Sequence, residues 1–215
     1  MKSVSLLSGG KDSFFATLIA MEQGLEITEC VTVEPVEFSE MFHFPNFQFA
    51  KEVGELLGLK TVFLKEDSFY SGLKEIIEKD GIQAVISGAL ASNFQKTRIE
   101  RFCSENNVMS YTPLWLMDQE NELRGLIGSG IKAMIISVSA EGLGKEFLGR
   151  EFNEELIEDL KRQDLKIRIN LSGEGGEYES FVTGYRNKFL KITDYEDDSY
   201  GSLSFRRIKK LSKTH

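Results

Sequence analysis

Residues 8–13 read Ser-Gly-Gly-Lys-Asp-Ser, and they carry the groups that an anion-binding turn needs. The adjacent glycines, Gly9 and Gly10, let the backbone approach a phosphate closely, so that N–H groups can point at it. The hydroxyls of Ser8 and Ser13 can donate hydrogen bonds, and Lys11 adds a positive charge on a long side chain. The segment therefore predicts a binding site for a nucleotide polyphosphate.

The segments on either side of this turn predict the elements that position it. The apolar run at residues 4–7 is typical of a buried parallel strand. A helix that begins near Asp12 would place four apolar side chains on one face, namely Phe14, Phe15, Leu18 and Ile19. A strand, a glycine turn and a helix N-terminus together favour anion binding, because the helix dipole is positive at that end.

The spacing excludes two other nucleotide-binding motifs. A Walker A loop would need glycine where this chain has Ser5, and a Gly-x-Gly-x-x-Gly fingerprint is excluded because the two glycines are adjacent. The segment instead resembles the PP-loop of the ATP pyrophosphatases, a family that cleaves ATP between the α- and β-phosphates. The resemblance implies that the turn holds pyrophosphate while AMP is transferred to an acceptor oxygen.

The composition excludes several classes of protein. The chain has 215 residues, of which 41% are hydrophobic, and a formal net charge of −8. This acidic balance argues against a general nucleic-acid binder, which needs clustered Lys and Arg, and the basic stretch at 206–210 is typical of a solvated terminal segment. No apolar run approaches the ~18 residues of a membrane helix. The first residues show no signal peptide, so a cytoplasmic enzyme is expected.

Cysteine and histidine are scarce. Cys30 falls in a strand pattern and Cys103 in a helix pattern, so both are expected to be reduced, buried thiols. The two histidines are His43 and His215, and no Cys-x-x-Cys pair exists, so the sequence predicts no Cys/His zinc site.

The first half of the chain alternates strand and helix patterns. Strands are expected at residues 26–34, 60–64, 84–86 and 108–111, and helices at 46–58, 69–79 and 95–106. Such βα repeats predict a Rossmann-like parallel sheet with helices on both faces, a fold of the α/β class. Ligands of these sheets bind at the carboxyl ends of the strands.

The rhythm changes in the second half. Helices are expected near 118–127 and at 153–163, and strands at 133–138, 165–169, 184–193 and 202–208. The sequence thus predicts two domains: a PP-loop ATP-binding domain at residues 1–130, and a smaller α+β domain at 131–215.

The second domain contains an acidic, glycine-rich loop at residues 171–180. Three carboxylates and three glycines lie within ten positions, so a tight loop could aim several anions at a cation or an ammonium group. The residues of interest are Glu174, Gly175, Gly176, Glu177, Tyr178 and Glu179.

A third group of residues follows the strand at 84–86. Gly88 and Ala89 are small enough to allow close approach of a ligand, and Gln95 and Arg98 share a face of the next helix because they are three positions apart. Arg98 could pair with a phosphate or a substrate carboxylate, and Glu100 lies on the same helix.

Taken together, these motifs resemble the diphthine–ammonia ligase family. The matching segments are residues 8–13, His43-Phe44-Pro45-Asn46, residues 87–89 with 95–100, Pro113-Leu114-Trp115, and Glu174 to Ser180. The last of these is far more selective than the PP-loop. Phe44 and Ser180 depart mildly from the family pattern, and the chain has no room for the extra C-terminal domains of fungal relatives, which favours an archaeal source.

The resemblance implies the last step of diphthamide synthesis. Diphthine on translation elongation factor 2 would react with ATP and ammonium to give diphthamide, AMP and pyrophosphate, with Mg²⁺ near Asp12. No nucleic-acid or membrane partner is expected, and a homodimer is left open. Free ammonia is the expected nitrogen source.

The resemblance also assigns roles to residues. The catalytic residues would be Lys11, Asp12, Glu174, Glu177 and Glu179. ATP would be bound by residues 8–13 with Thr32, Val33, Gly88 and Ala89. The substrate would be bound by His43, Asn46, Gln95, Arg98, Glu100, Gly175, Gly176 and Tyr178.

Two other functions stay open on the sequence alone. The chain could be another PP-loop ligase that amidates a small-molecule carboxylate or modifies tRNA, or a non-catalytic ATP sensor. AMP and pyrophosphate as products would favour a ligase.

Overall fold

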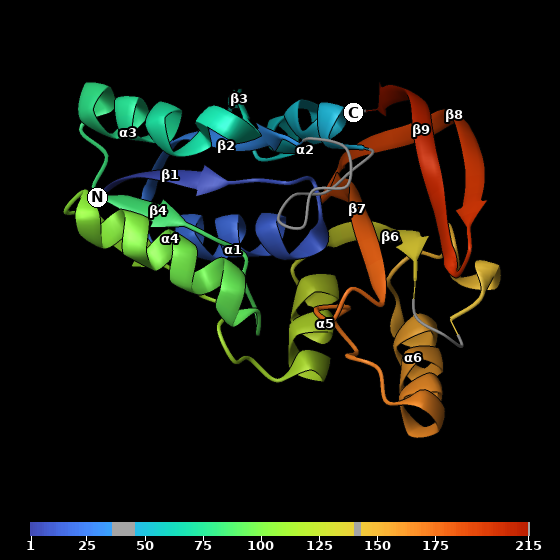
Figure 1. Cartoon of the computed structure of the whole chain (residues 1–215). Coiled ribbons are helices and arrows are strands. Elements are labelled where there is room, and N and C mark those ends of the chain that lie inside the picture. The colour runs from blue at the N-terminus through green and yellow to red at the C-terminus, as the bar shows by residue number, and fades with distance from the viewer. Residues whose placement is uncertain (36–45, 140–142, 215) are drawn as a thin grey trace. The chain divides into compact units, whose positions relative to one another are not determined.

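The computed structural model describes residues 1–35, 46–139 and 143–214. The chain forms two compact units, Met1–Trp115 and Leu116–His215 (Figure 1). The sequence suggested a boundary near residue 130, whereas the division follows Trp115. It falls earlier because helix α5 (Gln119–Gly128) packs against strand β6 (Ile131–Val138) and helix α6 (Glu154–Ile167) of the second unit.

The first unit is built on a five-stranded parallel sheet with the order β3-β2-β1-β4-β5. Its strands are β1 (Lys2–Leu6), β2 (Glu26–Glu34), β3 (Thr61–Lys65), β4 (Ala84–Ile86) and β5 (Met109–Tyr111). Its helices are α1 (Lys11–Glu22), α2 (Ala50–Leu56), α3 (Phe69–Asp80) and α4 (Asn93–Glu105), with the 3₁₀ turns η1 (Phe47–Phe49) and η2 (Glu66–Ser68). The predicted Rossmann-like α/β fold is confirmed.

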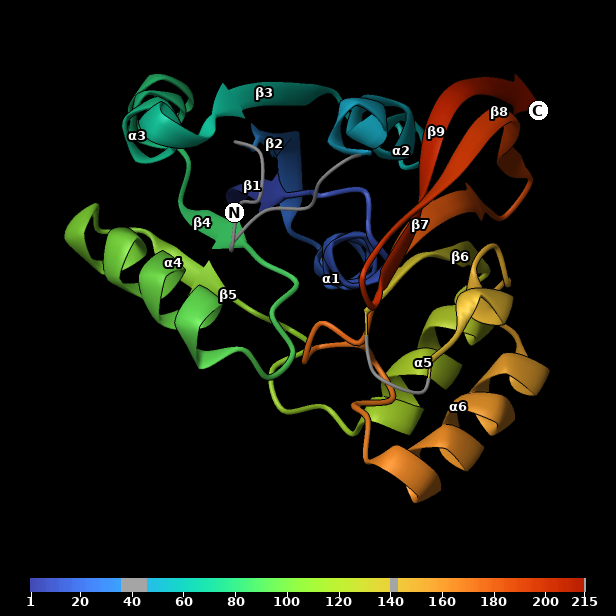
Figure 2. The ribbon, with the colours of Figure 1, turned by 45° about the vertical axis from the view of Figure 1, so that its right-hand side comes forward.

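Alternation along β1 shows which helices cover which face of the sheet. Ser5 bonds to Thr17 of α1, with 2.7 Å between the two hydroxyl oxygens, whereas Val4 belongs to a cluster with residues of α3 and α4. Neighbouring side chains of a strand point to opposite faces, so α1 lies on one face and α3 and α4 on the other. Figure 2 shows α1 and α2 together on the side opposite α3 and α4.

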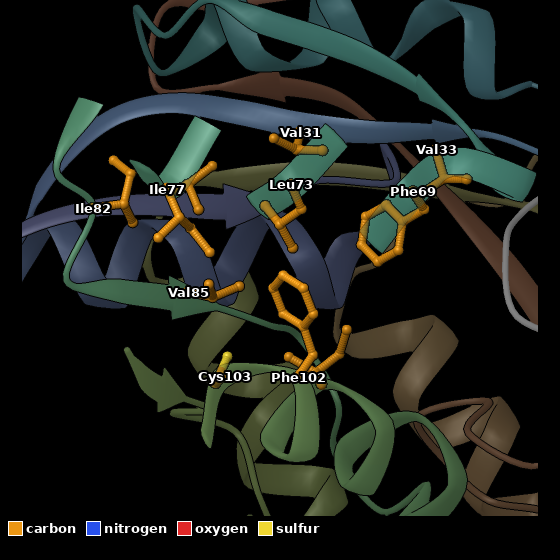
Figure 3. Packing of buried hydrophobic residues seen from close by; sticks show 11 residues of the cluster. Val31, Val33, Phe69, Leu73, Ile77, Ile82, Val85, Phe102 and Cys103 are labelled. Atoms are coloured by element: carbon orange, nitrogen blue, oxygen red, sulfur yellow. The ribbon is translucent and has the colours of Figure 1, made fainter. Parts of the chain in front are cut away.

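The core under α3 and α4 is a continuous apolar cluster (Figure 3). Phe69, Leu73 and Ile77 recur along α3 at intervals of four, the spacing that keeps side chains on one helical face. They meet strand residues such as Val31 and Val85. Their burial fixes α3 against the sheet.

Both cysteines are free and buried, as predicted. Burial raises the pKa of the Cys30 thiol to about 12 and that of the Cys103 thiol to about 11. Because the thiolate is the reactive form, about one Cys103 in 10³ and one Cys30 in 10⁴ would be ionised at pH 8.

We therefore expect an aromatic disulfide reagent to label neither thiol of the folded protein promptly at pH 8, and to label both once guanidinium has unfolded the chain. The absorbance of the released thiolate measures this. Stoichiometric labelling within the first seconds under native conditions would contradict the burial of these side chains.

The second unit combines a closed antiparallel barrel of four strands with two helices. The strands pair in the order β6-β7-β8-β9, and β9 pairs with β6 to close the ring. The three later strands are β7 (Tyr178–Tyr185), β8 (Lys188–Tyr200) and β9 (Leu203–Thr214), and a 3₁₀ turn, η3 (Lys145–Phe147), follows β6. Helix α6 begins with an Asn153 cap, whose Oδ1 accepts the N–H of Leu156 at 2.8 Å.

Two of the expected strands of this unit are wrong. Residues 165–169 were expected to form a strand, but α6 continues to Ile167, and Leu165 is 87% exposed on its last turn. The single strand expected at 184–193 is divided by a turn at Arg186, which has a φ of 55°. Within the described residues, no helix is long and apolar enough to cross a bilayer.

Candidate functional site

The strand order places two polar segments at the same point of the sheet. The order β3-β2-β1-β4-β5 reverses between β1 and β4, which makes this a topological switch point. Residues 8–13 follow β1, and residues 87–89 follow β4. Because the carboxyl ends of parallel strands meet at one edge, these segments are neighbours there, where open α/β sheets bind their ligands.

The turn after β1 is held by its own hydroxyl groups. Gly9 has a φ of 93°, a conformation that side chains rarely adopt, so the turn requires glycine here. The Ser13 hydroxyl donates to the carbonyl of Gly10 at 3.0 Å and accepts the N–H of Ser8 at 3.2 Å. The Ser8 hydroxyl accepts the N–H of Gly10 at 3.3 Å. The two serines thus organise the loop.

Helix α1 begins directly from this loop. Gly10 is its N-cap residue, and no side chain of the described residues caps it. The first N–H groups of a helix have no partner within the helix, so an uncapped N-terminus at the sheet edge presents donors to a ligand. Those donors and the helix dipole fit a phosphate group.

Lys11 supplies the cation of the turn. Its side chain is only 1% exposed, and its Nζ donates to Oδ1 of Asp12 at 2.5 Å. Asp12 itself is 27% exposed, which leaves part of its carboxylate open to other partners. Mg²⁺ is bound in proteins by one or two carboxylates together with substrate phosphates and water. Asp12 beside a phosphate site fits that donor set.

A buried hydroxyl relay anchors the start of α1 to the sheet. Thr17 donates its hydroxyl to the carbonyl of Ser13 at 2.6 Å, and its oxygen lies 2.7 Å from that of Ser5 on β1. Ser5 and Thr17 are both 0% exposed. The relay ties the residue that organises the turn to the strand before it.

Gly88 allows the first turn of α1 to lie against the end of β4. A Cβ at this position would lie 2.6 Å from the backbone nitrogen of Ser13 and 2.7 Å from the carbonyl carbon of Asp12. These are backbone atoms that a rotamer change cannot move, so only glycine permits the contact. Gly88 thus admits the backbone of α1, and its predicted role in the close approach of a ligand stays a prediction.

We expect Gly88→Ala to destabilise the protein by about 1–3 kcal/mol, the usual cost of forcing extra atoms into a packed site. It should also weaken nucleotide binding, because α1 must shift. Denaturant unfolding and calorimetric titration with ATP measure the two effects. Gly128→Ala is the matched control, since a Cβ there meets nothing within 4 Å. Equal stability of the two variants would contradict the contact.

The other residues expected to bind nucleotide have different surroundings. The Thr32 hydroxyl donates to the carbonyl of Leu7 at 2.5 Å, which joins β2 to the segment entering the turn. Val33 packs within the core cluster under α3 and α4. Ala89 is 6% exposed at the end of β4. Thr32 is therefore tied to the segment that enters the turn, and Ala89 follows Gly88, which contacts the start of α1. The Val33 side chain stabilises the sheet.

The residues expected on α4 are engaged with one another or exposed. Ser92 caps the helix by accepting the N–H of Gln95 at 3.4 Å. The Arg98 guanidinium lies 4.9 Å from the ring centroid of Phe94. Glu100 accepts a hydrogen bond from Lys96 at 2.5 Å. Gln95 and Arg98 remain candidates for substrate binding, and Glu100 has a cationic partner on its own helix.

The motif around His43 is only partly described. His43 lies outside the described residues. Asn46 is 5% exposed, and its carbonyl accepts the N–H of Phe49 at 3.1 Å in the turn that leads into α2.

In the second unit, the acidic loop positions one carboxylate more firmly than a surface turn would. Oε1 of Glu177 accepts the backbone N–H and the side-chain Nδ2–H of Asn170, both at 2.8 Å. Its other oxygen, Oε2, is buried and has no hydrogen-bond partner among the described residues. An unpaired buried acceptor costs about 1–3 kcal/mol, which makes this oxygen a candidate for binding a hydrogen-bond donor.

The backbone of the same residue is also fixed. The carbonyl of Glu177 accepts the N–H of Ser139 at 2.9 Å, and the Ser139 hydroxyl donates to the carbonyl of Gly176. These bonds extend the β6–β7 ladder by one step, next to a register shift between Ile135 and Ser137. Glu177 therefore projects from the rigid end of a strand.

The remaining candidates of the loop differ in exposure and role. Tyr178 is 4% exposed, and its hydroxyl donates to the carbonyl of Leu171 at 2.5 Å. Its ring packs 5.8 Å from that of Phe152, so it stabilises the loop from inside. Glu174 and Glu179 are partly buried, and Glu179 points to the opposite face of β7 from Tyr178.

Two glycines shape the loop for different reasons. Gly176 has a φ of 82° with open space around it, so it serves the turn. A Cβ at Gly175 would lie 2.6 Å from both Asn170 Nδ2 and Glu177 Oε1, so only glycine admits their contact.

Sequence reasoning did not single out two side chains that complete this loop. Gln119, at the start of α5, donates its Nε2–H to Asn170 Oδ1 at 3.1 Å and accepts the N–H of Ser172 at 3.3 Å. Gln119 and Asn170 are 51 positions apart, and neither sits in a recognisable motif. Ser172 is 3% exposed, and its Oγ has no hydrogen-bond partner in the described part of the chain.

Helix α5, which supplies Gln119, is joined to α6 by salt bridges between their side chains. Arg124 bonds to Glu120 at 2.9 Å and also to Glu154, and Lys161 lies 3.2 Å from Glu120. Hydrogen bonds from Arg124 and Lys161 hold the pKa of the Glu120 carboxyl below its usual value. The pairs hold the start of α5 in place beside the loop.

A glycine- and serine-rich turn before a helix, at the switch point of a five-stranded parallel sheet, is the arrangement by which α/β folds bind phosphate groups. The comparison with known families agrees in both halves. The diphthamide synthase N-terminal domain matches residues 1–110, and the diphthamide synthase C-terminal domain matches residues 118–214. The chain belongs to the diphthamide synthase family, which confirms the resemblance seen in its motifs.

Individual relatives cover nearly all of the chain. A diphthine–ammonia ligase of Homo sapiens is 26% identical and one of Danio rerio 28%, each over 98% of this chain, with 92% and 96% of the relative covered. One of Schizosaccharomyces pombe is 28% identical over 99% of this chain, which spans 40% of that protein. A solved structure described as a predicted subunit of tRNA methyltransferase from Methanocaldococcus jannaschii is 15% identical, with a TM-score of 0.46, and the match covers 86% of this chain and 98% of that chain.

Proposed function

We propose that the protein is an AMP-forming ligase that converts diphthine on elongation factor 2 to diphthamide with ATP and ammonium. The observation that carries the proposal is the match of both halves to diphthamide synthase domains in a chain whose PP-loop lies at the switch point of its sheet. Relatives named diphthine–ammonia ligase support the reaction.

In the first half-reaction, the first unit binds ATP and the diphthine carboxylate attacks the α-phosphate. Carboxylate oxygen is a poor leaving group, so ammonia cannot displace it directly. Transfer of AMP to that oxygen makes an acyl-adenylate and releases pyrophosphate. The N–H groups at the start of α1, the hydroxyl of Ser8, and Lys11 stabilise the charge that builds on the departing pyrophosphate, while Ser13 holds the turn through its bond to the Gly10 carbonyl.

Asp12 would hold Mg²⁺, together with phosphate oxygens. The ion supplies neutralisation of phosphate charge. Thr32, Gly88 and Ala89 would line the nucleotide site at the ends of β2 and β4. Asn46, Gln95 and Arg98 would contact the protein substrate, with His43.

In the second half-reaction, the acidic loop of the second unit supplies the nitrogen. Ammonium is attracted by carboxylates, and Glu177 offers a carboxylate oxygen that is buried and lacks a donor in the described residues. Loss of a proton from ammonium gives ammonia, which attacks the acyl carbon and displaces AMP. Glu174 and Glu179 would add negative charge around this position.

The test is direct. Purified protein is incubated with ATP, Mg²⁺, ammonium chloride and elongation factor 2 that carries diphthine, and the modified histidine peptide is analysed by mass spectrometry. Conversion of carboxylate to amide that requires both ATP and ammonium supports the proposal. Unchanged diphthine would contradict it, and amidation of a small carboxylic acid or modification of tRNA instead would favour the alternative ligases. A cytoplasmic location and an archaeal source stay predictions from the sequence.

A further inference from the structure

We propose that Asn170 and Gln119 are positioning residues that hold the Glu177 carboxylate with one oxygen reserved for ammonium. The inference rests on the proposed function, because it concerns the ammonium-dependent half of that reaction. It adds two residues, one on α5 and one in the loop after α6, that lie outside the motifs named in the sequence.

The network has a fixed direction of hydrogen bonding. Gln119 Nε2–H donates to Asn170 Oδ1, so the amide nitrogen of Asn170 must be the atom that faces Glu177. With the backbone N–H of Asn170, it gives Glu177 Oε1 two donors at 2.8 Å. Oε1 is thereby satisfied, and its carboxylate cannot rotate without losing both bonds.

Oε2 is left as the reactive end. It is buried and accepts no hydrogen bond from the described residues, although a carboxylate oxygen ordinarily takes more than one donor. Ammonium carries four N–H donors and a positive charge, so it can supply both things that Oε2 lacks. Among the described residues, no Lys or Arg side chain gives Oε2 a hydrogen bond.

A second unpartnered oxygen belongs to the same loop. Ser172 is 3% exposed, and its Oγ has no partner in the described residues, while its N–H donates to the side-chain oxygen Oε1 of Gln119. Gln119 therefore fixes the backbone of Ser172 and the amide of Asn170 at once. Ser172 Oγ and Glu177 Oε2 can each accept a hydrogen bond, which is the chemistry that a small hydrogen-bonding cation requires.

Each proton and the leaving group have a stated destination in this scheme. Ammonium gives up one proton, for which Glu177 Oε2 is the acceptor, and the ammonia formed makes the C–N bond as the acyl C–O bond to AMP breaks. A second proton then leaves the nitrogen of the adduct to solvent, which gives the neutral amide and AMP. No redox partner is required.

The network predicts different outcomes for the two half-reactions. Gln119→Glu replaces the donor that orients Asn170 with an acceptor, and Asn170→Asp places a second carboxylate against Glu177. We expect each variant to raise the KM for ammonium by about tenfold or more, the scale expected for the loss of a group that orients a binding residue. Pyrophosphate–ATP exchange that depends on diphthine but needs no ammonium should keep its wild-type rate.

Hydroxamate formation from hydroxylamine distinguishes a positioning role from a merely structural one. Hydroxylamine is largely uncharged at neutral pH, so it can intercept the acyl-adenylate without a cation site, and hydroxamate formation should persist in both variants. Asn121→Asp is the matched control, because Asn121 is an exposed amide on α5 two positions after Gln119. It should behave like the wild type with ammonium.

Selective loss of ammonium use, with exchange and hydroxamate formation retained, supports the inference. Wild-type ammonium kinetics in Gln119→Glu and Asn170→Asp would overturn it, as would parallel loss of exchange, hydroxamate and amide. Failure of the proposed function would look different, because the wild-type protein itself would then form no amide.

Discussion

Glu177→Gln is expected to lower ammonium-dependent turnover by about 10²–10⁴-fold, the range for loss of a positioned acid–base group. Two N–H donors from Asn170 point at Oε1, so the carbonyl oxygen of the new amide should take that place. Its NH₂ group must then occupy the position of Oε2, where it presents hydrogens to ammonium instead of a negative charge. The loop should keep its structure and lose its function.

The measurement is amide formation against ammonium concentration, together with calorimetric titration with ATP. The dissociation constant for ATP should match the wild type, because Glu177 and the PP-loop belong to different units. Glu155→Gln is the control, since Glu155 is an exposed carboxylate of α6. Wild-type turnover by Glu177→Gln would remove this residue from the reaction and reopen Glu174 and Glu179.

Lys11→Met is expected to lower the rate of adenylation, and overall turnover with it, by about 10²–10³-fold for loss of one preorganised group that stabilises developing charge. Methionine is also unbranched, so it can occupy much of the buried space while the cation is lost. Lys11 is 1% exposed, where water screens its charge little, and Asp12 would lose its partner at 2.5 Å. The defect should appear in pyrophosphate–ATP exchange, unlike that of Glu177→Gln.

Exchange of labelled pyrophosphate into ATP, with diphthine-bearing elongation factor 2 present and ammonium absent, measures this effect. Lys51→Met tests whether loss of any lysine matters, since Lys51 is exposed on α2. Exchange at the wild-type rate in Lys11→Met would show that this cation does not stabilise the departing pyrophosphate.

The first unit could be predicted from the sequence because its signals are local. Several strands contain short apolar runs, α3 ends at Gly81 in the left-handed conformation, and strands and helices alternate along the described part of the unit. The phosphate-binding turn follows from the same signals, since a glycine pair between a strand and a helix determines where N–H groups point. The contact between Gly88 and Ser13 could not be predicted in this way, because it depends on how α1 packs against the segment after β4.

The second unit could not be predicted as well, for physical reasons. Residues 165–169 alternate apolar and basic side chains like a strand, yet Leu165 and Ile167 belong to the exposed last turn of α6. The β7–β8 turn uses Arg186 at a positive φ, where glycine or asparagine would have signalled a hairpin.

The network around Glu177 depends on contacts far apart in sequence. Gln119 begins a helix and Asn170 follows one, and only folding brings their amides together. The motif of the loop marks three carboxylates equally. The hydrogen bonds distinguish Glu177 from the other two, because they satisfy one of its oxygens and leave the other without a donor in the described residues.

The most direct test of the account is the stoichiometry of the nucleotide products. Protein, ATP labelled on the α-phosphate, ammonium and diphthine-bearing elongation factor 2 are mixed, and nucleotides, pyrophosphate and diphthamide are quantified together over time. The account predicts that AMP, pyrophosphate and the new amide appear in equal amounts, and that AMP formation stops when the diphthine carboxylate is blocked. Formation of ADP and phosphate, or of AMP without any amide, would contradict it.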